Sequence, residues 1–498
     1  ICNLNVSIKV NNTFLFSSQI SAFKLYKDYK PDLDYESISL YFRYNYIPSP
    51  KSIYKNIFKL DPGNILEYDL KQNIILKIKP WFSLSNLYLD NYNQFKGNFN
   101  DSIKLFSEKI SNSVSYHKNL DVKTGIYLSG GLDSSILAAS IAKDYEISTH
   151  NIRFESKDYD ESSNARALSK YIGSNHYEYL IKPNDIQNII ENISSIYDEP
   201  FADSSQIPTS LLSANSKNKI KVALTGDGGD EFFMGYNRYI WAVKIYKRIN
   251  QMPNFLRKVI FMFLSSPLSK QFINFLNLYF LPNNLKLNHT INKLEKILNI
   301  ISNKDDFKKI YEGFLLNWND DILGTNNNLF DHIITNKDLH LWEIGFSDEE
   351  KMMLVDTKNY LCDDILTKVD RATMFYGIEA RAPFLNLELI KFAYSLPIDF
   401  KLKNNQGKYL MREYLDKINI PNFNNFSKKG FHMPIKEWIR EDMREYFIEN
   451  LNSKNIKENN ILDYNLISNT LQDHLNFNQN NEYKIWSIFI FFQWYANQ

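Results

Sequence analysis

One seven-residue loop, Ser-Gly-Gly-Leu-Asp-Ser-Ser at 129–135, constrains the fold of this chain more than any other segment. A short apolar run at 125–128 precedes it, and a run with helical patterning at 136–142 follows it. Such a strand–loop–helix unit forms an anion site, because backbone N–H groups and the helix dipole face the ligand and glycines permit close approach. The loop lacks the Lys-Ser/Thr ending of a Walker A motif, so it differs from kinase and GTPase loops.

Bulk composition excludes several classes of protein. The 498 residues include 58 Lys or Arg and 57 Asp or Glu, so no basic field indicates a nucleic-acid partner. The two cysteines, Cys2 and Cys362, make a disulfide framework or metal cluster unexpected and favour a reducing cytoplasm. The most apolar run, 259–264, is too short to span a bilayer, so we expect no membrane partner.

The order of apolar runs predicts an α/β fold. From about residue 94 to 235, helical patterns alternate with strand-like runs at 125–128, 147–154 and 220–224, which predicts βαβ units and a parallel sheet. Ligands of such sheets bind beyond the carboxyl ends of the strands. Residues 236–340 are predicted to be a helical insertion or cap, and 341–400 and 429–498 to be helical.

A second acidic, glycine-rich loop, Thr-Gly-Asp-Gly-Gly-Asp-Glu at 225–231, follows the strand at 220–224. Glycines permit positive φ, and carboxylates among them favour Mg²⁺ shared with phosphate oxygens. A plain turn or a calcium loop is the alternative, although the spacing does not match an EF-hand.

Two further charged segments allow two interpretations each. The charges of 363–374 and 379–385 recur at helical spacing, so they are either surface ion pairs or site residues. The basic pair in Ser-Lys-Lys-Gly-Phe at 427–431 is either solvated surface or a functional loop.

Taken together, segments 129–135, 197–205, 225–239 and 363–385 resemble the synthetase domain of glutamine-dependent asparagine synthetases, whose loop is the PP-loop of ATP pyrophosphatases. Segments 16–20 and 46–50 are similar to the end of that family's glutaminase domain and to its linker. The resemblance implies a parallel-sheet PP-loop domain of the adenine nucleotide alpha hydrolase type with helical additions at 94–498. A linker at 76–93 and the β-rich C-terminal part of an Ntn-type glutaminase domain at 1–75 would precede it.

The resemblance also implies a reaction. Full-length members use ATP to amidate aspartate to asparagine through aspartyl-AMP, releasing AMP and pyrophosphate, with ammonia taken from glutamine. The expected cofactors are ATP and Mg²⁺. The expected partners are aspartate, ATP and ammonia or glutamine, and the assembly considered is a homodimer.

Motif matching gives individual residues roles by resemblance. Asp133 and Asp230 would hold Mg²⁺, and Asp227, where family members often carry Glu, would orient or deprotonate ammonia. Lys428 would neutralise charge during adenylation. Residues expected to contact the nucleotide or pyrophosphate are Leu128, Ser129, Gly130, Gly131, Asp133, Ser134, Ser135, Ile152, Thr225 and Gly226. Residues expected in the acceptor pocket and its walls are Asp198, Glu199, Asp203, Lys368, Asp370 and Arg371.

The N-terminus departs from the family pattern. Family members begin with a catalytic Cys between the initiator Met and Gly, whereas Cys2 lies between Ile1 and Asn3, about 125 residues before the loop. We therefore expect an N-terminally truncated chain that uses free ammonia, with Cys2 a buried strand residue and no residue assigned to glutamine hydrolysis.

Three alternatives stay open at this point. A PP-loop amidotransferase could act on another carboxylate, such as a sugar acid or a peptide, because a fold does not fix the substrate. A catalytically idle binding module is disfavoured by the acidic residues of both loops and by Lys428. A tRNA-modifying PP-loop enzyme is disfavoured by the balanced charge and the lack of cysteine pairs.

Overall fold

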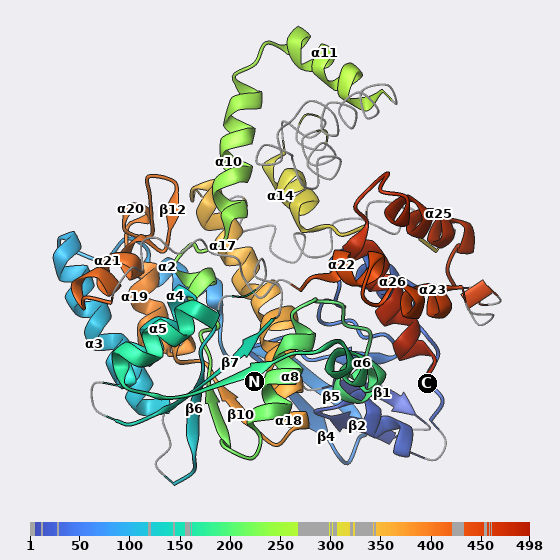
Figure 1. Cartoon of the computed structure of the whole chain (residues 1–498), viewed down its shortest axis with the longest axis horizontal. Coiled ribbons are helices and arrows are strands. Elements are labelled where there is room, and N and C mark those ends of the chain that lie inside the picture. The colour runs from blue at the N-terminus through green and yellow to red at the C-terminus, as the bar shows by residue number, and fades with distance from the viewer. Residues whose placement is uncertain are drawn as a thin grey trace.

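The computed structural model in Figure 1 describes most of the chain. The described residues are 5–10, 13–26, 29–117, 121–142, 145–154, 160, 162–266, 298, 301, 306–318, 322–323, 342, 345–420, 433–452, 456–457, 459 and 461–498.

A five-stranded parallel sheet organises the larger part of the molecule, in the strand order β10-β9-β6-β7-β8. The three inner strands, β6 (Thr124–Tyr127), β7 (Ser148–Arg153) and β9 (Val222–Leu224), confirm the predicted runs to within two residues. The two edge strands, β8 (Asn175–Leu180) and β10 (Glu379–Arg381), were not predicted. Segment 379–381 therefore belongs to the sheet and not to a helix surface.

Helices cover both faces of this sheet (Figure 1). α4 (Leu132–Ile141) packs on β6, and α5 (Ser162–Ile172) packs on β7 and β8. After β8, the chain returns across the sheet and adds β9 on the other side of β6, with α8 (Gln206–Ser216) in the connection. These connections are right-handed crossovers, so α8 lies on the opposite face of the sheet from α4 and α5. This reversal creates a switch point between β6 and β9, where ligands of doubly wound sheets bind.

The N-terminal segment contains a small antiparallel sheet, with strands in the order β2-β1-β3. Its strands are β1 (Asn5–Val10), β2 (Thr13–Ser17) and β3 (Ile57–Lys59), and a hairpin of β4 (Asn64–Asp69) and β5 (Ile74–Pro80) follows. The predicted β-rich character is observed, but helix α1 (Tyr35–Tyr44) was not expected, because its aromatic residues also suit a strand. Strand β5 continues across the expected boundary at residue 75.

The last helix, α26 (Glu482–Tyr495), joins the N-terminal segment to the rest of the molecule. The Tyr41 hydroxyl on α1 donates to the backbone carbonyl of Ser487, at 2.7 Å, and both residues are buried. The indole N–H of Trp494 donates to the carbonyl of Asp198, at 3.1 Å. α26 is buried on most sides, which explains its nearly continuous apolar sequence.

The remaining helices fill the space around the sheet and extend from it. α10 (Asn237–Asn250) leads away from the sheet to α11 (Asn254–Ser265) in Figure 1. The others are α2 (Leu84–Asn91), α3 (Phe99–His117), α6 (Pro183–Glu191), α7 (Ile193–Ile196), α9 (Gly229–Phe232), α14 (Phe307–Leu315), α17 (Asp348–Lys358), α18 (Thr367–Phe375), α19 (Leu387–Ser395), α20 (Ile398–Lys401), α21 (Tyr409–Lys417), α22 (Ile435–Arg440), α23 (Arg444–Leu451) and α25 (Tyr464–Leu475). Among the helices described, none has the length and apolar content needed to cross a membrane.

Candidate functional site

The two glycine-rich loops meet at the switch point between β6 and β9. These strands pair in parallel, so the loops that follow them leave the sheet at the same edge. A Cβ on Gly226 would lie 2.8 Å from the Cβ of Asp133 and 3.0 Å from the backbone nitrogen of Ser134. Glycine at 226 is therefore what lets the second loop contact the first.

The first loop is shaped to present polar groups. Gly130 adopts φ +82°, a conformation that favours glycine, and Gly131 is the N-cap of α4. The Ser129 hydroxyl lies 3.1 Å from the Ser134 hydroxyl and accepts the backbone N–H of Gly131, at 3.1 Å. Two hydroxyls therefore lie beside the start of a ten-residue helix, as the sequence predicts for an anion site.

Lys408 was not identified from the sequence, yet it lies at the centre of the site. Its ammonium donates to both carboxylate oxygens of Asp133, at 2.7 and 2.6 Å, and pairs with Oδ1 of Asp230 at 2.6 Å. Burial opposes the charge, but Asp133 and Asp230 outweigh it and raise the pKa of Lys408. The two aspartates expected to hold metal thus converge on one buried ammonium.

Local backbone structure explains how Lys408 reaches the site. It is the N-cap residue of α21 and adopts a left-handed conformation with φ +56°. Its N–H donates to the carbonyl of Phe233, at 2.9 Å, directly after the second loop. The preceding hairpin of β11 (Leu402–Lys403) and β12 (Gln406–Gly407) brings the backbone to this point. The polar turn before Lys408 was the one sequence signal available.

A cavity of about 200 Å³ opens between the two loops, α8 and α18. Eight of the residues expected in the site line it: Ser129, Asp133, Ser134, Thr225, Gly226, Asp227, Asp230 and Lys368. Its other lining residues are Tyr127, Ser205, Thr209, Leu212, Gly228, Glu231, Tyr236, Ile365 and Val369. Leu128, Gly130, Gly131, Ser135 and Ile152 do not line it. Leu128 and Ile152 are buried at the ends of β6 and β7.

Asp227 lines this cavity and has one unsatisfied carboxylate oxygen. Its Oδ2 is shielded from solvent and makes no hydrogen bond within the described residues. Burial raises the pKa of Asp227, although Thr225 and Lys368 favour the charged form. A buried acceptor without a partner is unfavourable unless a ligand supplies a donor.

Glu231 and Tyr236 form a second acidic element of the wall. Glu231 is buried, and the Tyr236 hydroxyl donates to its Oε1 at 2.6 Å. Burial and the nearby charge of Asp230 raise the pKa of Glu231 to about 7.

Lys368 connects the cavity to two aspartates, Asp203, which is half-buried, and Asp364, which is buried. Its ammonium donates to Oδ2 of Asp203 and to the Ser205 hydroxyl, both at 2.8 Å. Burial opposes ionisation of Asp203, but Lys368 outweighs it and lowers the pKa of Asp203. Burial and Asp203 raise the pKa of Asp364 well above its usual range. Lys368, Asp363 and Asp364 are all buried, so for these three residues the interpretation as surface ion pairs is wrong.

Three of the residues expected in the acceptor walls, Asp198, Glu199 and Arg371, lie where the N-terminal segment docks. Asp198 Oδ2 accepts the backbone N–H of Ile20, at 3.0 Å.

Arg371 lies 3.6 Å from Asp198 and donates to the carbonyl of Ser18, at 2.6 Å. Glu199 accepts the N–H of Ile53, at 3.1 Å, and forms an ion pair with Lys59. These three residues line a separate cavity of about 30 Å³, and Asp370 lines neither cavity.

Two expected residues, Lys428 and Cys2, lie outside the described part of the chain. The role of Lys428 in adenylation therefore stays a prediction, as does the buried strand position of Cys2. Cys362 is half-buried and unbridged.

The donor set fits a magnesium ion only in part. Within the described ranges, no group of three or more His, Cys, Asp or Glu side chains could hold a metal ion. Asp133 and Asp230 supply two carboxylates, and Mg²⁺ in phosphate sites is commonly held by one or two carboxylates together with phosphate oxygens. The residues thus suit an ion that arrives with a phosphate ligand.

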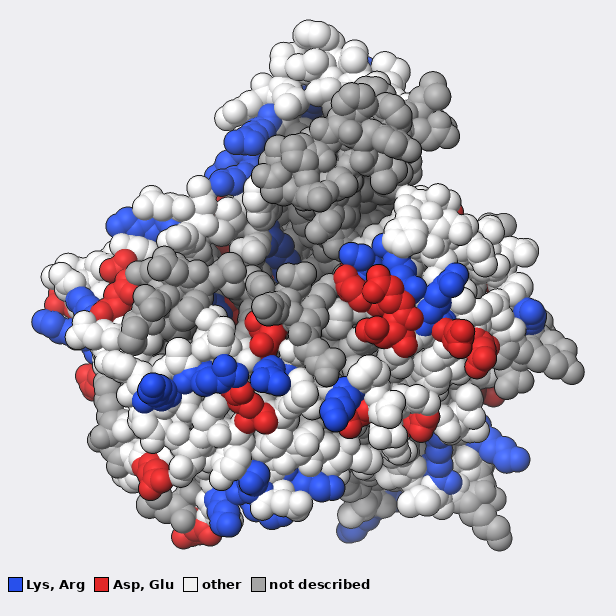
Figure 2. Space-filling model, in the orientation of Figure 1, with Lys and Arg blue, Asp and Glu red and all other residues white. Residues whose placement is uncertain are grey.

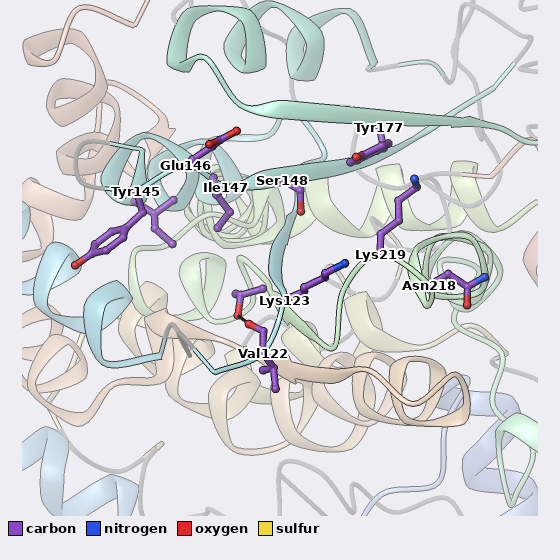
Figure 3. Close-up of a pocket in the computed structure, with 11 residues that line it drawn as sticks. Val122, Lys123, Tyr145, Glu146, Ile147, Ser148, Tyr177, Asn218 and Lys219 are labelled. Atoms are coloured by element: carbon purple, nitrogen blue, oxygen red, sulfur yellow. Dashed lines mark hydrogen bonds between the residues drawn. The ribbon is translucent and has the colours of Figure 1, made fainter.

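A wider cavity, of about 550 Å³, lies at the opposite, amino-terminal edge of the sheet (Figure 3). Lys123 and Lys219 point towards its centre from the segments before β6 and β9, and the Lys219 ammonium lies 4.0 Å from the ring centroid of Tyr177. Residues 118–120 and 143–144, which adjoin this cavity in the chain, lie outside the described residues. None of the expected site residues lines it.

The fold and the site define a class of protein: an α/β protein whose parallel sheet carries a PP-loop, preceded by a small segment of the glutamine amidotransferase type. Comparison with known families agrees. The profile for asparagine synthase matches residues 105–496, and that for a glutamine amidotransferase domain matches residues 4–81. This chain belongs to the asparagine synthase family.

Individual relatives are similar over most of the chain. Asparagine synthetase (glutamine-hydrolyzing) 1 of Bacillus subtilis (strain 168) is 27% identical over 93% of this chain and 69% of its own length. A Methanocaldococcus jannaschii protein provisionally named asparagine synthetase (glutamine-hydrolyzing) 2 is 32% identical over 73% of this chain and 66% of its own length. The matched region thus spans about two thirds of each relative.

Proposed function

We propose that this chain catalyses the ATP-dependent amidation of aspartate through an aspartyl-AMP intermediate, with release of AMP and pyrophosphate. The observation that carries the proposal is the junction of the two loops, where Asp133 and Asp230 share the ammonium of Lys408. Family membership supports the reaction class, and the names of the relatives, glutamine-hydrolyzing asparagine synthetases, support asparagine as the product and glutamine as the nitrogen source.

Adenylation creates negative charge at the α-phosphate and on departing pyrophosphate. The start of α4, the hydroxyls of Ser129 and Ser134, and the Lys408 ammonium surround the place where these phosphates would lie. Fixed dipoles and a buried cation stabilise such charge without reorganising during the reaction. Magnesium, held by Asp133 and Asp230 with the phosphates, would supply further positive charge.

Breakdown of the acyl-adenylate requires ammonia to lose a proton as it attacks the carbonyl carbon. Asp227 is our candidate for this role, because it lines the cavity, its Oδ2 has no hydrogen-bond partner within the described residues, and its pKa is raised by burial. A carboxylate with raised pKa accepts a proton more readily than an ordinary aspartate. Lys368 lies on the same wall and favours the charged form of Asp227.

The decisive experiment is acceptor-dependent exchange of labelled pyrophosphate into ATP. The exchange requires a reversible adenylate, so aspartate should stimulate it, and net turnover with ammonia or glutamine should yield AMP and pyrophosphate in equal amounts. ADP and phosphate as products would refute cleavage between the α- and β-phosphates. Exchange stimulated by a sugar acid or a peptide, but not by aspartate, would keep the chemistry and change the acceptor.

A further inference from the structure

Helix α11 exposes its apolar face to solvent. The exposed fractions are 71% for Phe255, 53% for Val259, 65% for Met262 and 54% for Phe263. These residues follow one another at spacings of four, three and one, so they lie on one side of the helix. Arg257, by contrast, is only 9% exposed. Lys258 is exposed, as is usual for a charged residue. A surface helix of a globular protein ordinarily turns its apolar stripe inwards, so the exposure of this face is unusual.

The position of α11 makes this face available to a large partner. α10 begins just after the second site loop, packs against α14 and α17, and carries α11 away from the sheet (Figure 1). Trp241 on α10 is 57% exposed and adds an aromatic residue to the projection. Isolated exposed apolar residues are ordinary, but a continuous exposed apolar helix face indicates an interaction surface.

Charge identifies the kind of partner. Residues 237–266, which comprise α10 and α11, contain six Lys or Arg and no Asp or Glu, although Arg238 is ion-paired to Asp356. Within the described helices, Lys247, Arg248 and Lys258 are exposed, and blue side chains line the visible edge of α10 in Figure 2, below the tip formed by α11. Lys258 is on α11 itself, and Lys247 and Arg248 are in the last turn of α10. An exposed apolar helix face combined with exposed basic side chains and no acidic ones is the pattern of a helix that lies in the interface of an anionic membrane.

We propose that α10 and α11 form a docking surface for anionic phospholipid membranes, with the α11 face defined by Phe255, Val259, Met262 and Phe263 inserted at the headgroup level. The sequence alone predicted no membrane partner, because that expectation considered only spanning segments. A second copy of this chain is a less suitable occupant, since it would bring an equally basic helix pair to the contact. Nucleic acid would contact the basic side chains but leave the apolar face unused.

The test is co-sedimentation of the full chain with vesicles. Wild type should bind vesicles of phosphatidylcholine with phosphatidylglycerol as about one lipid in three, and should bind pure phosphatidylcholine at least about tenfold more weakly. Raised salt should weaken binding, because charges at the surface are screened. Phe255→Asp with Met262→Asp, and separately Lys247→Glu with Arg248→Glu, should each lower binding at least about tenfold.

Matched controls lie on the β4–β5 hairpin. Leu70 is 89% exposed, so Leu70→Asp adds a charge to an exposed apolar residue elsewhere, and Lys71→Glu with Lys77→Glu reverses two exposed basic residues. Both controls should bind like wild type. Thermal unfolding of all variants verifies that they fold. No residue of α11 lines the site cavity.

Several results would overturn the proposal. Absence of binding to both vesicle types would do so, as would equal loss in the hairpin controls. If wild type does not bind vesicles but light scattering shows that it is a dimer and that the α11 variants are monomers, the face would be assigned to a second copy of the chain. A large loss of thermal stability in the α11 variants, again without vesicle binding, would assign it to another segment of the same chain. Binding of RNA or DNA in place of vesicles would assign it to nucleic acid.

Discussion

Lys408 donates to both carboxylate oxygens of Asp133, at 2.7 and 2.6 Å, although 275 residues separate them in the chain. The same ammonium pairs with Asp230, so one cation links the PP-loop, the second glycine-rich loop and the start of α21. Because Asp133 and Asp230 both line the site cavity, this ammonium links the two loops that form its wall.

Lys408→Met should lower acceptor-dependent pyrophosphate exchange on the order of 100-fold, because a buried cation beside the phosphates would be lost. It should also destabilise the protein, since Asp133 and Asp230 would lie close together without a counter-charge. Exchange assays and thermal unfolding measure the two effects. Lys403→Met is the control, since Lys403 is exposed on the adjacent hairpin, where its ammonium lies near the Tyr409 ring and hydroxyl. Full exchange activity in Lys408→Met would contradict the proposal that the phosphates of ATP bind beside Lys408.

Asp133→Asn and Asp230→Asn should each reduce exchange on the order of 100-fold, with the largest deficit at limiting Mg²⁺. Each variant keeps the shape of the side chain but removes a charge that contacts Lys408. Titration of the exchange rate with Mg²⁺ separates a metal role from a role in positioning Lys408. A deficit that excess Mg²⁺ reduces supports metal binding, whereas a deficit independent of Mg²⁺ contradicts it.

Asp227→Asn should block amide formation while leaving pyrophosphate exchange within about threefold of wild type, since the proposed proton transfer follows adenylation. The raised pKa of Asp227 also predicts the pH dependence of amide formation. As the pH is lowered, the rate should begin to fall at a higher pH than the one at which an ordinary aspartate becomes protonated. Asp227→Glu should restore part of the activity. If Asp227→Asn lost exchange and amidation equally, Asp227 would act in binding or adenylation.

Lys428→Ala should lower turnover far more than it raises the apparent KM for ATP, if its charge acts mainly in the transition state of adenylation. The neighbouring substitution Lys429→Ala is the matched control and should be close to neutral. Pyrophosphate exchange isolates the step concerned. Equal effects of the two substitutions would favour the alternative interpretation, in which Lys428 is a solvated surface residue.

Glu231 should make stability depend on pH. Its pKa, raised to about 7, exceeds the unfolded value near 4.5, so the folded protein favours the protonated form. The stabilisation is complete below pH 4.5 and is lost as pH rises through 7. Relative to Glu231→Gln, wild type should lose on the order of 3 kcal/mol of unfolding free energy over that interval. Denaturant unfolding at several pH values measures this, and Glu388→Gln, an exposed substitution, should show no such trend.

The sequence was sufficient to predict those parts of the site that are formed by residues close together in the chain. The strands β6 and β9 are short, buried and largely apolar, and both loops are recognisable by their glycine and acidic residues. Strand β7 is buried as well, although most of its residues are polar. The edge strands β8 and β10 were missed, because half-exposed residues such as those of Asn175–Leu180 carry no apolar run.

Lys408 was missed for a different reason: its partner Asp133 lies 275 residues away in the chain. No local pattern distinguishes a buried, paired lysine from a solvated one. The outward face of α11 was missed likewise, because amphipathic periodicity reports a helix face but not the direction in which tertiary packing turns it.

The contact between Tyr41 on α1 and Ser487 on α26 has a consequence for folding during synthesis. The ribosome must release 446 further residues before α1 meets its partner, so the apolar side of α1 stays unsatisfied for most of translation. Closing so long a loop also makes this contact a late event in the assembly of the native core. A nascent chain stalled before residue 482 should therefore be a substrate for chaperones, and become independent of them once α26 has emerged.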